Sequence, residues 1–225
     1  MEDRLTIFFS SQRELFLERT RRMATLIAFW GARINLTAAP RDPREIGFHI
    51  IDSLAPISLG AGDKTLRHAF ARDNRILDLG SGAGFPGLIL AAASPAHFTL
   101  LEGRRKRASF LAVAAADMGL NNVTVESRLE FTHLGRASSP DRDRAKWPFD
   151  VVTGRAYSFP PRFHSAAASA LRPGGIAILY ANPAQRLSLS SAEQNGLLEF
   201  RHVAYTISRD DRKVERILAL WRRRG

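Results

Sequence analysis

The amino-acid sequence predicts an α/β fold, a doubly wound and mostly parallel sheet that closes with an antiparallel C-terminal strand. Three short apolar runs, at residues 76–79, 98–102 and 123–126, alternate with alanine-rich stretches of helical length. Strands that alternate with helices form βαβ units, whose strands run parallel. Near the C-terminus, two apolar runs are separated only by the polar turn 208–213, which is too short for a crossover helix and therefore predicts a hairpin.

The first 60 residues predict a short helical extension ahead of the sheet domain, which we assign to residues 61–225. From residue 12 to residue 30, apolar side chains recur at steps of three and four, as on one face of an amphipathic helix. The tetrapeptide at 42–45, Asp-Pro-Arg-Glu, resembles a capping box with proline at the first helical position. A second helix is therefore expected to run from this box to about Ser58.

The segments that follow complete the predicted order. Residues 60–74 are polar and mixed, which indicates a connection into the sheet domain. A fourth strand is expected at 149–153 and a fifth at 176–180, directly behind a Leu-Arg-Pro-Gly-Gly turn. The hairpin is expected to pair residues 200–207 with residues 216–221.

The composition excludes several classes of chemistry. The chain has no cysteine, so disulfides, thiolate nucleophiles and zinc ribbons are excluded. Its six histidines have spacings that match no helical metal pair, and we expect no metal. No apolar run approaches the roughly 20 residues that span a bilayer, and the first residues lack the pattern of a signal peptide. We therefore expect a cytoplasmic protein without a membrane partner.

The charge balance favours a polyanionic partner. Lysine and arginine number 33 against 22 acids, which gives a formal net charge of +11. Such a surplus attracts a phosphate backbone and displaces its counterions, so nucleic acid is the leading partner. A coding bias toward arginine is the alternative explanation. It accounts for arginine in place of lysine, but not for the surplus of cations over acids.

Residues 76–87, Ile-Leu-Asp-Leu-Gly-Ser-Gly-Ala-Gly-Phe-Pro-Gly, form the most informative segment, an apolar strand followed by a glycine-rich turn and then a helix. Glycines such as Gly80, Gly82 and Gly84 permit positive φ and let the backbone approach a ligand closely. The N-terminus of the following helix offers unpaired N–H groups to a carboxylate or phosphate. We therefore predict a ligand site at this loop, at the carboxyl ends of the strands.

Two cofactors compete for this loop. Residues 82–87 satisfy the G-x-G-x-x-G fingerprint of dinucleotide-binding proteins, and Glu102 lies about where the ribose-binding acid should be. Asp78 inside the strand, the extra glycine at position 80, the turn before the fifth strand and the closing hairpin favour S-adenosylmethionine instead. This combination is typical of the Rossmann-like class I methyltransferases.

Two acids near the loop have alternative roles. Glu102 ends the second strand, where its carboxylate would accept hydrogen bonds from both ribose hydroxyls, or would pair with the cations at positions 104–106. Asp78 is expected to anchor the glycine turn, or to meet the methionine ammonium through water. Neither is expected to take part in the chemistry.

The sequence also narrows the kind of methylation. Transfer to carbon 5 of a pyrimidine normally requires a cysteine nucleophile, which the chain lacks. Transfer to an exocyclic amine usually relies on an Asn/Asp-Pro-Pro-aromatic element after strand four, where residues 154–157 read Gly-Arg-Ala-Tyr. A ring nitrogen such as N7 of guanine needs no general base, so positioning supplies the rate. The sequence permits this last reaction without requiring it.

Several segments together resemble the bacterial small-subunit rRNA (guanine-N7)-methyltransferase family, also called glucose-inhibited division protein B. The Asn-Leu-Thr and His-x-x-Asp-Ser-Leu elements lie outside the generic cofactor fold and are the most specific of these segments. The resemblance implies methylation of N7 of a guanine in 16S rRNA, free or within the small-subunit ribosomal particle. The segments that carry it are residues 34–38, 42–43, 49–54, 76–87, 127–130 and 154–156.

The resemblance also implies roles for individual residues. Cofactor contacts are implied at Gly80, Phe85, Leu129, Glu130 and Arg155. Phe85 would form an apolar wall beside the cofactor, while Leu129 and Glu130 would hold the adenine edge. Arg155, at the end of strand four, would position cofactor and nucleotide without a general base.

His49 and Asp52 are expected to bind the substrate. They are spaced i and i+3 on the second predicted helix, so they share one face. The alternative is that one of them only hydrogen-bonds the loop at residues 35–37.

The sequence departs from the family pattern at three places. Phe48 stands where the family usually has an arginine, Asn182-Pro183 replaces a Lys-Gly pair, and the loop at 134–148 is longer. Two other functions therefore stay open, an rRNA or ribosome-assembly binding protein with decayed activity and a methyltransferase that acts on another RNA position.

Overall fold

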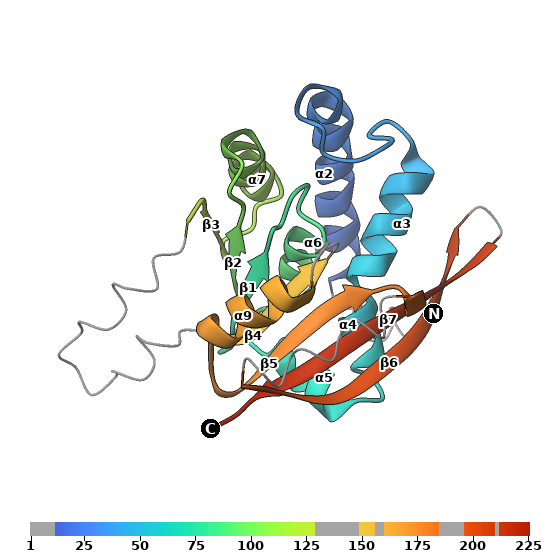
Figure 1. Ribbon diagram of the computed structural model, residues 1–225. Helices are drawn as coiled ribbons and strands as arrows, with labels where there is room; N and C mark the ends of the chain where they lie inside the picture. Colours follow the sequence, from blue (N-terminus) through green and yellow to red (C-terminus); the bar gives the residue numbers. More distant parts are fainter. Residues whose placement is uncertain (1–11, 129–148, 156–159, 185–195, 210–211) are drawn as a thin grey trace.

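The computed structural model describes residues 12–128, 149–155, 160–184, 196–209 and 212–225. In this part of the chain, seven strands form one sheet in the order β3-β2-β1-β4-β5-β7-β6 (Figure 1). The first five strands run parallel, and β7 is antiparallel to both of its neighbours. The strands are β1 (Arg75–Leu79), β2 (His97–Leu101), β3 (Val123–Glu126), β4 (Phe149–Arg155), β5 (Leu171–Ala181), β6 (Leu197–Arg209) and β7 (Arg212–Arg223).

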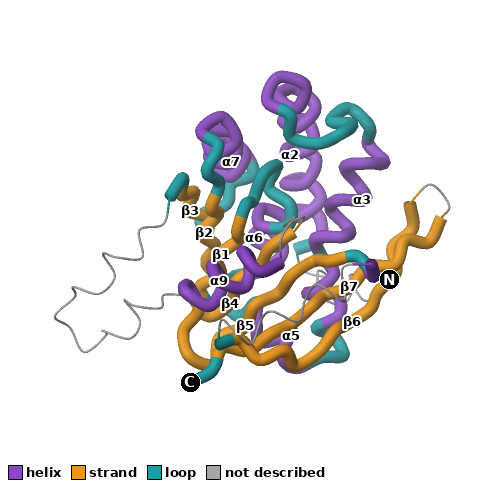
Figure 2. The backbone as a smooth tube through the Cα atoms, in the orientation of Figure 1, coloured by secondary structure: helices purple, strands orange, loops and turns teal. Residues whose placement is uncertain are grey.

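Helices cover both faces of this sheet (Figures 1 and 2). One core cluster joins α2, α6 and α7 to one face, and a second joins α9 to the other. Neighbouring residues of β1 divide between the two, with Ile76 in the first cluster and Leu77 in the second. The described helices are α2 (Arg13–Ile34), α3 (Pro43–Ser53), α4 (Ala55–Leu59), α5 (Lys64–Ala69), α6 (Gly87–Ala93), α7 (Arg105–Asp117) and α9 (Pro160–Ala170).

The doubly wound α/β class and the closing hairpin are confirmed. Pairing of β6 with β7 continues to Arg209 and Arg212, which leaves two residues between the strands. Strand β5 begins five residues earlier than expected, because the Leu-Arg-Pro-Gly-Gly segment pairs with β4 across a register shift. Gly174 in this segment has a φ of +75°, a value that glycine adopts without strain.

The second predicted helix is wrong in one respect, because it is interrupted. Helix α3 ends at Ser53 and α4 begins at Ala55. Pro56 has no N–H to donate to the carbonyl of Asp52, and its ring would clash there, so a regular helix does not continue. The Leu54 N–H instead contacts the carbonyls of Ile50 and Ile51, both at 3.2 Å.

The capping box at the start of α3 forms only in part. The Asp42 side chain accepts a hydrogen bond from the Arg44 N–H at 2.9 Å. The Asp42 N–H donates to the Ala39 carbonyl, and the Glu45 carboxylate contacts His49 and a strand of the hairpin instead. Tertiary contacts therefore use the acid that the local pattern assigned to capping.

The predicted connection at 60–74 contains the short helix α5. Its N-cap is Asp63, whose carboxylate accepts hydrogen bonds from the N–H groups of Thr65 and Leu66. Among the described helices, none has the length and apolarity that a membrane crossing needs. The described residues also contain no cluster of three or more acids and histidines suited to a metal ion.

Candidate active site

The glycine-rich turn leads from the end of β1 into α6. Gly80, Gly82 and Gly84 have φ values of +70°, +57° and +90°. The N–H groups of Gly80 and Ser81 donate to the carbonyl of Leu101, which holds the turn over the end of β2. A Cβ atom on Gly82 would meet only the Gly80 carbonyl oxygen, at 3.7 Å, so this glycine borders open space.

Asp78 lies buried beneath this turn. One carboxylate oxygen accepts a hydrogen bond from the Thr153 hydroxyl at 2.8 Å. The other has no hydrogen-bond partner among the described residues and lies beside Gly87, where a Cβ atom would approach it to 2.6 Å. Burial raises the pKa of Asp78 above its usual value. This placement favours the anchoring role over a direct contact with a ligand.

Glu102 follows β2 and reaches back to the glycine turn. Its Oε2 accepts the Gly82 N–H at 3.0 Å, and its Oε1 accepts the Arg104 N–H at 2.8 Å. The contact with Arg104 is through the backbone, so it is not the ion pair that the sequence left open. Glu102 is thus held at the edge of the turn with acceptor capacity left on both oxygens.

Arg155 ends β4 and lies against Phe85 of the glycine turn. Its Cζ atom is 5.3 Å from the Phe85 ring centroid. One terminal nitrogen donates to Asp52 and the other contacts Nδ1 of His49, both at 3.1 Å. Burial lowers the pKa of Arg155. Both arms of the guanidinium therefore contact the protein itself, although the sequence reasoning had left both for a ligand.

His49 connects Arg155 to Glu45. A guanidinium can only donate, so Nδ1 of His49 must accept the hydrogen bond from Arg155. Nε2 then carries the ring proton and donates it to Glu45 Oε1 at 3.1 Å. Burial and the charge of Arg155 lower the pKa of His49 to about 4. The ring is therefore neutral near pH 7 and packs 5.1 Å from Phe85.

Asp52 is fully buried at the centre of a network that the sequence reasoning missed in part. Besides Arg155, its carboxylate accepts two hydrogen bonds from Arg216, at 2.9 and 3.3 Å, and one from the Tyr205 hydroxyl at 2.8 Å. Burial alone would raise the pKa of Asp52, but hydrogen bonds and charge from Arg216 lower it. Two bonds on each oxygen leave Asp52 little capacity for a substrate.

Two partners of this network, Tyr205 and Arg216, come from the C-terminal hairpin. The one sequence signal for Arg216 is that it is a charged residue at the start of an otherwise apolar strand. Phe48 is also covered from the hairpin, because the Arg209 guanidinium lies 5.2 Å from its ring centroid and bonds Glu45 at 2.6 Å. A cation from β6 thus lies beside the position where the family pattern has arginine.

The structure brings most of the predicted residues together. Phe85 connects the glycine turn to the network around Arg155, since it belongs to the turn and contacts His49 and Arg155. Leu129 and Glu130 lie outside the described residues.

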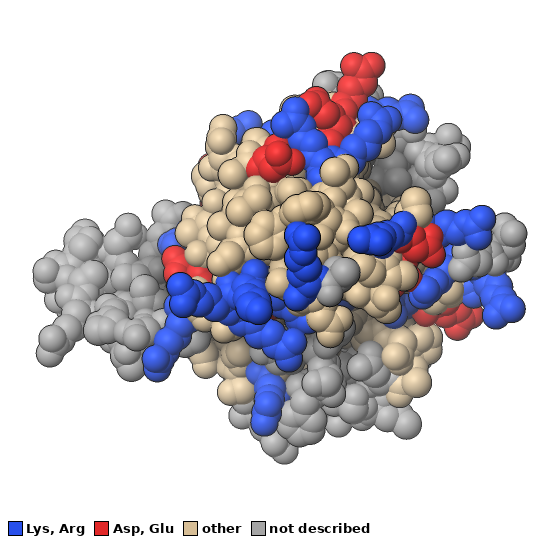
Figure 3. All heavy atoms as spheres, turned by 90° about the horizontal axis from the view of Figure 1, so that it is seen from above, with Lys and Arg blue, Asp and Glu red and all other residues tan. Residues whose placement is uncertain are grey.

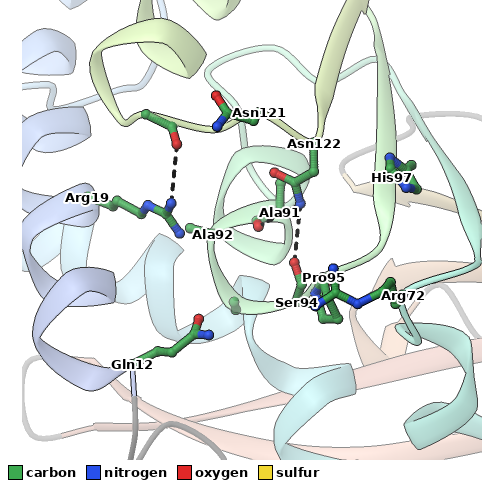
Figure 4. Close-up of a pocket in the computed structure, with 12 residues that line it drawn as sticks. Gln12, Arg19, Arg72, Ala91, Ala92, Ser94, Pro95, His97, Asn121 and Asn122 are labelled. Atoms are coloured by element: carbon green, nitrogen blue, oxygen red, sulfur yellow. Dashed lines mark hydrogen bonds between the residues drawn. The ribbon is translucent and has the colours of Figure 1, made fainter.

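A separate cavity of about 490 Å³ lies near the amino ends of β2 and β3 (Figure 4). Two of its polar side chains are occupied by backbone contacts. Asn122 donates to three carbonyls at the end of α6, and Arg19 donates to the carbonyls of Met118 and Gly119. These contacts fasten helix ends, and none of the predicted site residues lines the cavity.

Comparison with known proteins decides the family. The model of the GidB family, described as rRNA small subunit methyltransferase G, matches residues 17–213. The chain belongs to this family. Two similar relatives are both described as ribosomal RNA small subunit methyltransferase G. The protein from Acidiphilium cryptum is 36% identical over 76% of this chain and 70% of its own length. The one from Laribacter hongkongensis is 34% identical over 76% and 72%.

A solved structure supports the fold of this chain. A mutant of MtNAS in complex with S-adenosylmethionine aligns with a TM-score of 0.57 over 98% of this chain and 76% of that chain, at 13% identity. At this identity the likeness shows the class I methyltransferase fold alone. Family and fold together confirm an S-adenosylmethionine-dependent enzyme that methylates guanine N7 in 16S rRNA.

Proposed function

We propose that the glycine turn and its neighbours hold S-adenosylmethionine while the Arg155 network orients the target guanine. S-adenosylmethionine supplies an electrophilic methyl group when it is bound. The proposed cofactor residues are Asp78, as the anchor of the turn, and Gly80, Gly82, Gly84, Phe85, Glu102, Leu129, Glu130 and Arg155. His49 and Asp52 are proposed to act on the substrate side.

The described part of this site fits the cofactor. Gly82 borders open space, and a larger side chain there would enter it. Glu102 is fixed by the N–H groups of Gly82 and Arg104, and its remaining lone pairs suit the two ribose hydroxyls. Phe85, which is 6% exposed, belongs to the same turn and would form an apolar wall beside the cofactor.

The state of the groups around Arg155 supports a reaction without a general base. The Nδ1 lone pair of His49 is taken by Arg155, and Asp52 already accepts four hydrogen bonds. Neither group is therefore available to accept a proton from a substrate. N7 of guanine carries a lone pair and no proton, so it needs none. This match between an occupied acid–histidine pair and a proton-free nucleophile is the observation that carries the proposal.

Arg155 is proposed to orient the guanine. A guanidinium has five N–H donors, and two of them are used by Asp52 and His49 among the described residues. Guanine presents O6 next to N7 on the same edge. A donor from Arg155 to O6 would fix the ring and leave N7 free to attack. Asp52 and His49 would then act as positioning residues, because they hold Arg155 in place.

We further propose that the partner is 16S rRNA, free or within the small-subunit ribosomal particle, and that the reaction takes place in the cytoplasm. The net charge of +11 supports a large polyanion.

The test is mass-spectrometric mapping of 7-methylguanine in 16S rRNA from cells with and without the gene. We expect one modification to disappear and to return when the gene is restored. An unchanged map, together with calorimetry that detects no S-adenosylmethionine binding, would instead indicate an rRNA-binding protein with decayed activity.

A further inference from the structure

Four consecutive cations lie at the start of helix α7, and Gly103 separates them from Glu102. Arg104 is the N-cap residue and Arg105, Lys106 and Arg107 follow, with no acid in the first turn. The first three side chains are exposed, and no acid pairs with them among the described residues. The positive end of a helix disfavours cations, so this arrangement lowers the stability of the isolated helix.

The C-terminal part of α2 carries an exposed aromatic ring. Phe29 is 60% exposed, the largest value among the exposed large apolar side chains of the described residues. The Arg33 guanidinium lies 4.8 Å from its ring centroid, which covers one face. Arg107 donates to the carbonyl of Asn35 at 2.6 Å and so ties the start of α7 to the end of α2.

Both helix ends lie on the side of the molecule where the parallel strands have their carboxyl ends, which is also where the glycine turn lies. The Arg104 N–H bonds Glu102, whose other oxygen holds the turn, so the basic run starts at the rim of the cofactor site. In Figure 1, the end of α2 lies between α7 and α3. Figure 3, which views the molecule from above, shows basic side chains gathered on this face.

We propose that Phe29, Arg33 and the run Arg104–Lys106 form a basic–aromatic surface that binds the phosphate backbone and one unstacked base of 16S rRNA. The inference rests on the proposed function, which supplies the occupant. Phosphates would offset the unfavourable charge at the start of α7. A base would stack on the free face of Phe29, whose other face Arg33 supports. A single exposed ring among cations is better suited to bind RNA than to bind the apolar surface of another protein.

Two variants test the surface with a 16S rRNA transcript as the probe. Arg104→Ala/Arg105→Ala removes two phosphate contacts, so the slope of log affinity against log salt should fall by about 1.4. Phe29→Ala removes a stacking platform and should weaken rRNA binding by about five- to a hundredfold. Calorimetry should detect an unchanged affinity for S-adenosylmethionine in both, because alanine at position 104 keeps the backbone N–H that bonds Glu102. The double variant should also melt at or above the temperature of the wild type, because the helix loses unfavourable charge.

Matched controls lie at the other end of α2. Arg13→Ala removes one exposed cation, and Leu15→Ala removes a side chain that is 44% exposed. Both should bind rRNA like the wild type. If the Phe29 and Arg104/Arg105 variants bind rRNA like the controls while the wild type still methylates it, the surface is wrong and the proposed function stands. If the wild type does not methylate 16S rRNA, the proposed function itself fails.

Discussion

Asp52 shows how a single buried residue can organise a site through its hydrogen bonds to other side chains. It is fully buried, and its two oxygens collect donors from β4, β6 and β7 while it belongs to α3. A buried carboxylate is tolerated only when its charge is paired and hydrogen-bonded, and here both conditions hold. The consequence for Arg155 is that its guanidinium has a defined orientation before any ligand arrives.

Replacing Arg155 by lysine tests that orientation. Lysine keeps the charge but loses the planar fork that reaches Asp52 and His49 together. We expect turnover to fall about tenfold or more, equivalent to about 1.4 kcal/mol of transition-state stabilisation, with an unchanged fold. Steady-state kinetics with 16S rRNA provide the measurement. Arg172→Lys, at an exposed ion pair with Asp150, is the control and should keep normal turnover. A rise in the Michaelis constant alone would make Arg155 a simple phosphate contact.

His49 gives the protein a stability that depends on pH. Its folded-state pKa of about 4 lies below the ordinary 6.5, so the unfolded chain binds the proton more tightly. Stability from the neutral ring is present above pH 6.5 and is lost as the pH falls toward 4. Between pH 7 and pH 5, His49→Gln should reduce this loss by about 1–2 kcal/mol relative to the wild type. Chemical denaturation at both values measures it.

The control for this prediction is His68→Gln, which changes an exposed histidine. It should leave the pH dependence of the wild type intact. An equal loss of stability in the wild type and in His49→Gln would mean that His49 is not held neutral in the folded protein.

At the scale of elements, the strand–turn–helix unit from β1 to α6 shapes the cofactor site. Gly82→Val should abolish binding of S-adenosylmethionine, since the side chain would enter the open space beside the turn. Isothermal calorimetry measures the affinity. Gly119→Val is the matched control because Gly119 also has a positive φ, +63°, but lies at the end of α7 with open space around it. Normal affinity in a folded Gly82→Val protein would refute the assignment.

The β6–β7 hairpin holds α3 in place through hydrogen bonds to Glu45 and Asp52. Tyr205→Phe removes one hydrogen bond to a buried carboxylate without changing the shape of the side chain. We expect the free energy of unfolding to fall by about 1.5–3 kcal/mol, the range for hydrogen bonds to charged groups. Urea denaturation measures this loss. Unchanged stability would mean that water or another donor replaces the hydroxyl.

The separation of an N-terminal extension at residue 60 stays a prediction, although α2 and α3 share the core cluster of the sheet.

For the whole molecule, the excess of positive charge should control the binding of rRNA. Each phosphate contact on a single strand contributes about −0.7 to the slope of log affinity against log salt, so five contacts give about −3.5. Filter binding of a 16S rRNA transcript across a salt series measures the slope. A flat dependence would contradict a binding mode dominated by arginine and phosphate.

Local patterns were enough to predict the class of fold and the ligand loop. The alternation of strands and helices, the glycine turn at 80–84 and the hairpin around residues 210–211 depend on neighbours in the chain. Hydrophobic period and turn chemistry act over a few residues, which is why the sequence reports them. The break after α3 was also local, since Pro56 stands in the sequence, but it was missed.

Only the tertiary structure decided what surrounds Arg155. Asp52 bonds Arg155 across 103 positions, Tyr205 across 153 and Arg216 across 164. No periodicity or turn signal relates residues so far apart, because their meeting depends on the order of strands in the sheet and on the face that each strand presents. The sequence by itself determined the glycine turn and the acid that follows β2. The fold determined that the arginine at the end of β4 is held in place by a helix before the sheet and a hairpin after it.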